Sequence, residues 1–222
     1  MIFSDERRIN LKQWIVYLVG LLVMTFGIVL VIQADLGSAP WDVLHIGLYK
    51  QFGLTIGSWT IFVGIIVLST SAILAKAFPK LGAFLNMLLC GIFIDMYLLI
   101  PWLKTPASMV GQFLMLSLGI IFMAYGMAIY VSANVGTGPR DSLMLVIMQI
   151  TKMKVQWIRF IMEVLVLTVG WMLGGPVGVG TIVFCLTIGH VTGFALPQCQ
   201  KIINNWIEKR RANIVTETSN SL

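Results

Sequence analysis

The chain contains six apolar segments, each long enough to cross a lipid bilayer as a helix. A spanning helix needs about 20 consecutive apolar residues. The six segments cover approximately residues 13–33, 58–76, 81–101, 109–132, 157–174 and 177–197. Backbone amides and carbonyls find no water inside a bilayer, so segments of this kind fold there as helices. We therefore predict an all-α integral membrane protein with six transmembrane helices.

The composition supports a single transmembrane domain over residues 1–222. Hydrophobic residues make up 58% of the chain and charged residues 11%, which excludes an ordinary soluble globular domain. Polar tails are expected only at residues 1–10 and 203–222. The lipid bilayer is therefore the main environment of the protein.

The basic residues predict the orientation of the six spans. If the short segments described below do not cross, thirteen of the fifteen lysines and arginines fall on one side. Only Lys50 and Lys104 fall on the other side. Cytoplasmic loops of membrane proteins are enriched in basic residues, so both termini are predicted to be cytoplasmic.

A motif containing glycine, proline and aspartate occurs twice, 99 residues apart. The copies are ADLGSAPWDVL at 34–44 and ANVGTGPRDSL at 133–143. The residues repeated at this offset are Gly20, Gly27, Ala34, Gly37, Pro40, Asp42 and Leu44, which match Gly119, Gly126, Ala133, Gly136, Pro139, Asp141 and Leu143. With one deletion, Gly82 and Gly91 then match Gly180 and Gly189. We predict two repeats, at about 13–104 and about 109–200; because each has three spans, the repeats are inverted.

Each motif is followed by an apolar stretch too short to cross the membrane. Residues 41–52 and 140–152 would each rise about 18 Å as helices, roughly half of the hydrocarbon thickness. The glycines permit a turn, and each proline suits the first position of a helix. Paired, Gly/Pro-interrupted segments in inverted repeats are typical of secondary transporters. The short helices either re-enter the bilayer and line a central path or lie at its surface as amphipathic helices.

Seven residues of the two motifs are the candidates for a substrate path. They are Gly37, Pro40, Asp42, Gly136, Pro139, Arg140 and Asp141. The aspartates also suit the first turn of a helix, where a carboxylate accepts backbone amides. Arg140 stands where the first repeat has Trp41, so it serves either an anionic ligand or the anchoring of the inner face.

Three ionisable residues lie inside the predicted spans: Asp95, Glu163 and His190. Charge at membrane depth is costly and points to function, so Asp95 and His190 are candidates for coupling, for example in a proton relay. Alternatively, Asp95 reaches the outer interface and His190 makes one hydrogen bond between helices. For Glu163 we favour a contact with Arg159 at i, i+4. His45, in the first short segment, is expected at the membrane interface.

The sequence gives no sign of an enzyme or of a bound cofactor. It contains no phosphate-binding loop, no nucleophile elbow and no metalloprotease motif. The three cysteines form no Cys-x-x-Cys pair, so no metal site is expected. The thirteen methionines are expected to fill the helix bundle. The basic C-terminal run suits anionic lipid, and no nucleic-acid partner is indicated.

The two motifs, with the Gly-x8-Gly segments that follow them, resemble those of the bacterial YczE/YyaS/YitT family of multi-pass membrane proteins. The resemblance covers about residues 10 to 200 and fits the YczE-like branch, because no soluble domain follows the last span. It implies a bacterial plasma membrane protein with a transporter-like architecture. It supplies no catalytic residues and no substrate.

The function expected from these features is the movement of a small molecule or ion through a central site between the repeats. The alternative is a membrane accessory protein that scaffolds or regulates a partner assembly, as a monomer or a homo-oligomer. A polar cavity at the centre favours the first function, and a dry, packed centre favours the second.

Overall fold

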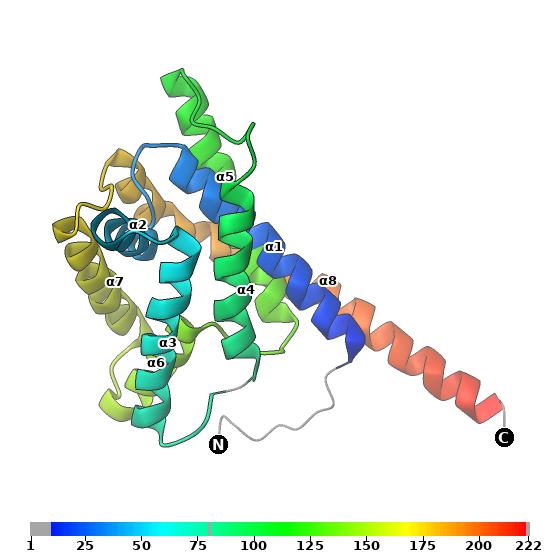
Figure 1. Cartoon of the computed structure of the whole chain (residues 1–222). Helices are drawn as coiled ribbons and strands as arrows, with labels where there is room; N and C mark the ends of the chain where they lie inside the picture. The colour runs from blue at the N-terminus through cyan, green and yellow to red at the C-terminus, as the bar shows by residue number, and fades with distance from the viewer. Residues whose placement is uncertain (1–9, 80, 221–222) are drawn as a thin grey trace.

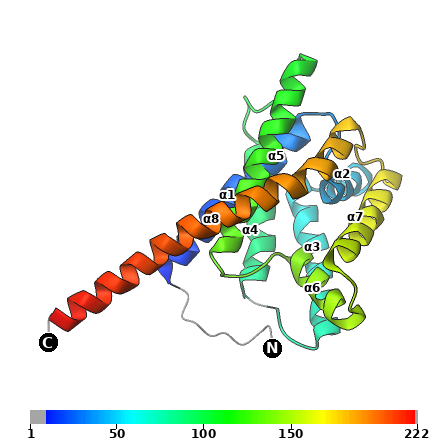
Figure 2. The same ribbon diagram turned by 180° about the vertical axis from the view of Figure 1, so that it is seen from behind.

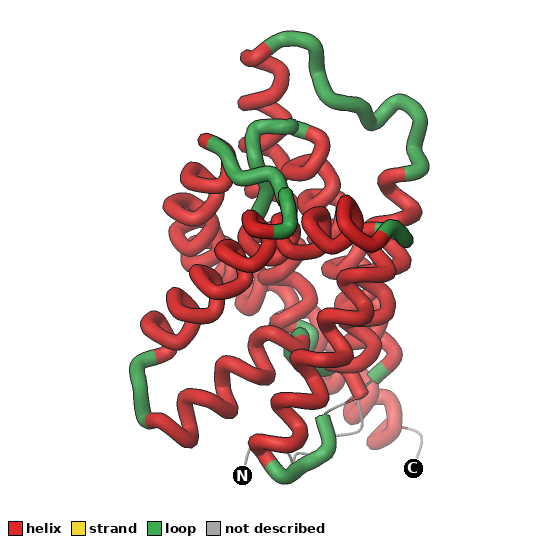
Figure 3. Tube along the Cα trace, turned by 60° about the vertical axis from the view of Figure 1, so that its left-hand side comes forward, coloured by secondary structure: helices red, strands yellow, loops and turns green. Residues whose placement is uncertain are grey.

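The computed structural model describes residues 10–79 and 81–220, with side chains up to Trp206. Over this part of the chain it contains eight α-helices and no strand, joined by short loops (Figures 1 and 3). The helices are α1 (Leu11–Gln33), α2 (Pro40–Phe52), α3 (Ile56–Ala75), α4 (Leu81–Leu98), α5 (Met109–Ser132), α6 (Pro139–Thr151), α7 (Val155–Met172) and α8 (Val179–Asn220).

Six of these helices are long and apolar enough to cross a membrane. They are α1, α3, α4, α5, α7 and the part of α8 from Val179 to Trp206. The six predicted spans are therefore present as helices of the expected length. The helix α8 continues through Pro197 into the predicted polar tail, and its end projects away from the bundle in both Figures 1 and 2.

The helices α1 and α5 form the centre of the bundle and approach each other closely. Gly27 of α1 faces Gly119 of α5, and a Cβ atom added at Gly119 would lie 2.9 Å from the Gly27 carbonyl oxygen. Gly20 and Gly126 face the partner helix in the same way, at Tyr130 and Met24. Small residues let helix backbones pack tightly within a membrane, where lipid provides no hydrophobic driving force.

The other helices pack around this central pair in a crossed pattern. The helix α4 packs on α1, and α8 packs on α5. The short helices exchange neighbours: α2 of the first half packs on α7 of the second, and α6 of the second half packs on α3 of the first. Each half therefore supplies part of the other's surroundings.

The loops before the two short helices share one left-handed residue, although Gly37 has a positive φ angle and its counterpart Gly136 does not. Asp35 and Asn134, 99 residues apart, have φ angles of 54° and 55°. Each turn then contacts the other half: the Gly180 amide donates to the Leu36 carbonyl at 2.6 Å, and a Cβ added at Gly136 would lie 2.7 Å from Gly82. Only glycine fits such close backbone approaches.

Candidate functional site

A cavity of about 150 Å³ lies in the middle of the bundle and is lined by residues from all eight helices. The motif residues in its wall come from the start of both short helices. They are Ala39, Pro40 and Trp41 at the start of α2 and Gly138, Pro139, Arg140 and Asp141 at the start of α6. Proline at the first position of each helix fixes where the helix begins, because it needs no amide partner there. The repeated motif thus places two helix N-termini at one cavity.

The first two turns of α2, from Pro40 to Gly47, are buried inside the protein. His45 is only 1% exposed, so it does not face water or lipid headgroups, as an interfacial residue is expected to do. Gly47 allows this burial, because a Cβ added there would lie 2.7 Å from the Gly170 carbonyl oxygen of α7. The sequence shows that α2 carries polar groups. It does not show which helices cover them.

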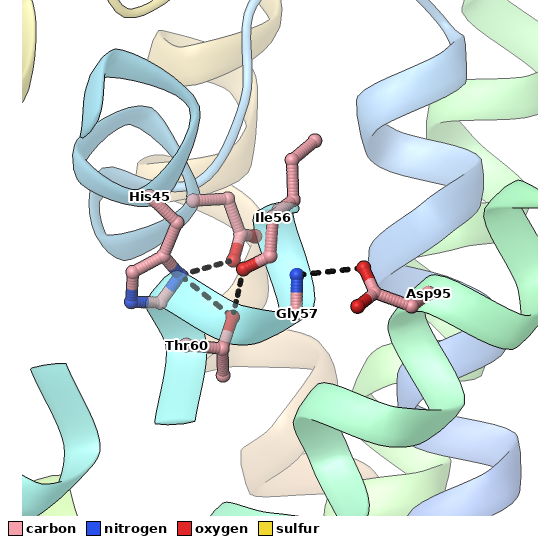
Figure 4. Close-up of polar contacts among 6 residues, drawn as sticks. His45, Ile56, Gly57, Thr60 and Asp95 are labelled. Carbon is pink, nitrogen blue, oxygen red and sulfur yellow. Dashed lines mark hydrogen bonds and ion pairs between the residues drawn. The ribbon is translucent and has the colours of Figure 1, made fainter. Parts of the chain in front are cut away.

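His45 joins α2 to α3 through polar contacts within the bundle. Its Nδ1 atom lies 3.2 Å from the Thr60 hydroxyl, which also donates to the Ile56 carbonyl at 3.0 Å (Figure 4). The same Nδ1 atom lies 3.8 Å from Oδ1 of Asp42. His45 and Thr60 both line the cavity, so this contact forms part of its wall.

Asp42 is buried beside the cavity and is not the helix cap that one interpretation predicted. It is 1% exposed, and its Oδ2 atom has no hydrogen-bond partner among the described residues. The N-cap position belongs to Ala39, and no side chain caps the helix. Buried carboxylates are costly unless paired, and the stabilising neighbours of Asp42 include His45, the Arg140 charge and the positive end of α2.

Arg140 meets Trp41 across the cavity, although the two residues occupy equivalent positions in the two repeats. The guanidinium carbon lies 4.5 Å from the centroid of the Trp41 ring, a cation–π distance. The ion pairs among described residues are Asp42 with His45 and Arg159 with Glu163, so none involves Arg140. Arg140 therefore presents a charge without a carboxylate partner to the cavity.

Two further polar side chains complete the Arg140 side of the cavity. The Tyr130 hydroxyl lies 3.4 Å from Oδ2 of Asp141, to which it donates a long hydrogen bond. Asn86 of α4 is 6% exposed, and its Nδ2 atom has no partner among the described residues. Its Oδ1 atom accepts a contact from the Cys90 thiol at 3.8 Å. Sequence reasoning missed Asn86 and Tyr130, because nothing in a single helix shows which face meets a cavity.

The rest of the cavity wall is mainly apolar and rich in methionine. Six of the thirteen methionines line the cavity: Met24, Met87, Met123, Met127, Met144 and Met162. They come from five different helices, so no spacing along the sequence marks them. Methionine is flexible and polarisable, and surfaces rich in it adapt to ligands of varied shape.

Glu163 contacts Arg159 as predicted, at 2.8 Å between Oε1 and Nε. The two side chains are 29% and 46% exposed and line the cavity from α7. They therefore mark the polar rim of the cavity, and the ion pair leaves neither charge free for a ligand.

Five of the predicted site residues do not line this cavity, and Asp42, described above, is one of them. Gly37 and Gly136 shape the turns that precede the short helices. Asp95 accepts hydrogen bonds from the Gly57 amide at 2.8 Å and from the Thr55 hydroxyl at 2.6 Å, at the start of α3 (Figure 4 shows the former). His190 is exposed on α8, and its ring contacts the Leu186 carbonyl of the same helix.

Residues of the types that bind metals are scattered over the part of the chain that the structure describes. No three histidine, cysteine, aspartate or glutamate residues cluster there as ligands. What the cavity offers is a guanidinium, a carboxylate, amide and hydroxyl groups, and an apolar wall. This combination suits the binding of a small polar molecule with an apolar part.

Comparison with known proteins places the chain among bacterial membrane proteins. It is 40% identical over 204 residues to the uncharacterized membrane protein YczE of Bacillus subtilis, covering 91% of this chain and 94% of that protein. It is 32% identical over 173 residues to YyaS of the same organism, covering 77% and 85% of the two chains. An uncharacterized protein of Haemophilus influenzae is 32% identical over 185 residues, covering 82% of each chain. No solved structure matches.

The family described as "Family of unknown function (DUF6198)" matches residues 11–197. This range includes both motifs and seven complete helices. The family match and the 40% identity to YczE lead to one conclusion. The chain belongs to this family of multi-pass membrane proteins, together with YczE and YyaS.

Proposed function

We propose that this protein is a transporter of a small molecule or ion, with its substrate site in the central cavity. The observation that carries the proposal is the meeting of both motif helices at that cavity, where Trp41 and Arg140 stack. A packed scaffold does not need a polar cavity at its centre, because unsatisfied polar groups there cost free energy. A transporter needs such groups in order to bind its substrate.

The proposal treats the two halves as inverted repeats. Equivalent helices have nearly equal lengths: α1 and α5 have 23 and 24 residues, and α2 and α6 have 13 each. Equivalent turns contact the opposite half through Leu36 with Gly180 and Val135 with Gly82. In transporters with this organisation, alternating access results from rocking one repeat against the other around a fixed site.

The proposal also treats α2 and α6 as re-entrant helices. Neither is long enough to span, and each starts at the cavity wall. Their flanking turns expose backbone groups that only protein or water can satisfy at membrane depth. The contact of each turn with the other half supplies those partners, as in the hydrogen bond from the Ser38 amide to the Pro176 carbonyl.

Thiol labelling from the two sides of the membrane tests this function without knowledge of the substrate. Met144→Cys and Thr60→Cys place single thiols in the cavity after Cys90, Cys185 and Cys199 are replaced and folding is verified. A small water-soluble reagent should label both positions in intact cells and also in inverted vesicles. Leu118→Cys is the matched control, because Leu118 is 50% exposed on α5 and should remain unlabelled in lipid.

The outcomes separate transport from a scaffolding role. Labelling from both sides means that the cavity opens to each side in turn. If the cavity thiols react from neither side, the centre is dry and transport is wrong. If they react from one side only, the protein is better described as a receptor or an accessory protein.

A further inference from the structure

We propose that the cavity binds a small zwitterion, whose carboxylate lies on Arg140 and Asn86 and whose ammonium group lies on Asp141. The ligand class is that of a small amino acid with an apolar side chain. This inference rests on the proposed function and adds the substrate class to it.

The first observation concerns two opposite charges that line the cavity without forming an ion pair. Arg140 and Asp141 are neighbours in the first turn of α6, and both line the cavity. Successive residues of a helix point about 100° apart, and no ion pair of 4 Å or less joins these two within the described chain. Neither charge therefore has an oppositely charged partner within 4 Å among the described residues.

The second step is a set of free donors around Arg140. Asn86 is more than nine-tenths buried and lines the cavity, and its Nδ2 atom donates to no described acceptor. The backbone amides of Arg140 and Asp141 also have no acceptor there, since they lie in the first turn of α6. A planar guanidinium with nearby N–H donors is suited to a carboxylate.

The third step is the acceptor on the other side. Asp141 accepts a long hydrogen bond from the Tyr130 hydroxyl, at 3.4 Å, and its other near donor is the Gly138 backbone amide. A carboxylate accepts several hydrogen bonds, so it retains room for an ammonium group. Of the other charged groups, Arg159 pairs with Glu163, and Asp42 lies outside the cavity lining with its Oδ1 atom 3.8 Å from His45.

Charge balance favours a zwitterion over a simple ion. A monoanion would neutralise Arg140 and leave Asp141 facing a second negative charge in a poorly solvated cavity. A monocation would leave Arg140 unpaired instead. A zwitterion neutralises both groups and adds no net charge, which keeps the electrostatic cost of a buried site low.

The size and lining of the cavity favour a short apolar side chain. A cavity of about 150 Å³ is comparable to one that admits benzene. The six methionines around it provide an adaptable apolar wall rather than further polar partners. The ligand is therefore a compact molecule with one apolar branch.

Calorimetry with three matched compounds tests the inference on the full-length purified protein in lipid nanodiscs. L-valine carries both charges, 3-methylbutanoate lacks its amine, and isobutylamine lacks its carboxylate. We expect valine to bind and the other two to bind at least about tenfold more weakly, because each leaves one charged group of the site unpaired. Equal binding of either single ion, or no binding of valine at millimolar concentration, overturns the inference.

Two variants test the two assigned contacts separately, one for the carboxylate and one for the ammonium group. Arg140→Gln should weaken valine at least about tenfold and leave isobutylamine unweakened, whereas Asp141→Asn should weaken valine and leave 3-methylbutanoate unweakened. Lys152→Gln removes the same charge from the exposed end of α6 and should change nothing. A variant that weakens all three compounds alike shows a structural role and contradicts the contact.

The thiol labelling described above keeps the two proposals separate. If the cavity is labelled from both sides but valine does not bind, the transport function stands and the zwitterion is wrong. If valine binds but labelling occurs from one side only, the ligand site stands and transport is wrong.

Discussion

The two halves of the molecule differ most where their last two helices face each other. In the first half, α3 packs on α4, and Asp95 of α4 accepts hydrogen bonds from the Thr55 hydroxyl and the Gly57 amide at the start of α3. In the second half, α7 makes no comparable packing with α8 within the described residues. We call α3 and α4 the closed pair and α7 and α8 the separated pair.

Equivalent glycines record the same difference. A Cβ atom added at Gly91 in the closed pair would lie 2.5 Å from the Gly57 carbonyl oxygen. At its counterpart Gly189, no atom of another helix lies within 4 Å of that position. Gly193, the counterpart of Asp95, is equally free. The repeat therefore carries one sequence pattern in two packing arrangements.

This difference shows on which side of the cavity the helices of the wall pack less closely on each other. Arg159 and Glu163 of α7 and Phe184 and Ile188 of α8 line the cavity on the separated side. Under the proposed function, transport requires the two halves to exchange arrangements, so that α7 closes on α8 while α3 leaves α4. The predictions below break or sharpen this comparison, from the largest effect to the smallest.

The largest expected effect is from a large side chain in the closed pair. Gly91→Leu should destabilise the protein by about 3 kcal/mol or more, because the Gly57 backbone cannot retreat without separating the helices. Gly189→Leu, the matched change in the second half, should leave stability nearly unchanged. Thermal unfolding of both variants in the same detergent measures the difference, and equal losses would refute the asymmetry.

Removal of the Asp95 side chain should open the closed pair more mildly. Asp95→Ala removes two hydrogen bonds to a carboxylate and is expected to cost about 2 kcal/mol, with Gly193→Ala as a silent control. Hydrogen exchange of the amides from Ile56 to Trp59 should accelerate in the first variant alone. Unchanged exchange there would mean that Asp95 does not hold the start of α3.

Loss of the ring under Arg140 should have a smaller effect on stability. Trp41→Leu keeps an apolar residue in the cavity wall and removes the cation–π contact, which by itself contributes about 1 kcal/mol. Chemical unfolding measures this change. Because Trp41 and Arg140 contact each other, the double variant Arg140→Gln, Trp41→Leu should lose less unfolding free energy than the sum of the two single losses. Strict additivity would show that the two groups are not coupled.

The smallest expected effect is at the rim. Glu163→Gln breaks an exposed i, i+4 pair with Arg159, which should change the unfolding free energy by about 0.5 kcal/mol or less. A loss well above 1 kcal/mol in the same unfolding assay would show that the pair closes the separated side rather than lining its edge.

The sequence predicted the helices and the broken motifs well, because both depend on local chemistry. Runs of apolar residues define the spans, and Pro40 and Pro139 begin the short helices as expected. It also singled out the difference between Trp41 and Arg140. It did not show that these two side chains stack, since that contact joins residues from opposite halves.

The polar residues of the spans were harder to place from sequence. His45 and Asp42 are buried by helices distant in the chain, and Asn86 lies at a cavity whose wall is built by all eight helices. His190 has the right chemistry for coupling but lies on an exposed face of α8. Charge at membrane depth therefore marked candidate residues without showing which of them share a site.

Distances between spin labels test the exchange of arrangements most directly. Labels at Ile66 and Ile92 report on α3 and α4, and labels at the equivalent Leu165 and His190 report on α7 and α8; all four side chains are exposed. In lipid, we expect Asp95→Ala to add a longer distance to the first pair and a shorter distance to the second. A change confined to the first pair, or no change in either, would contradict the account.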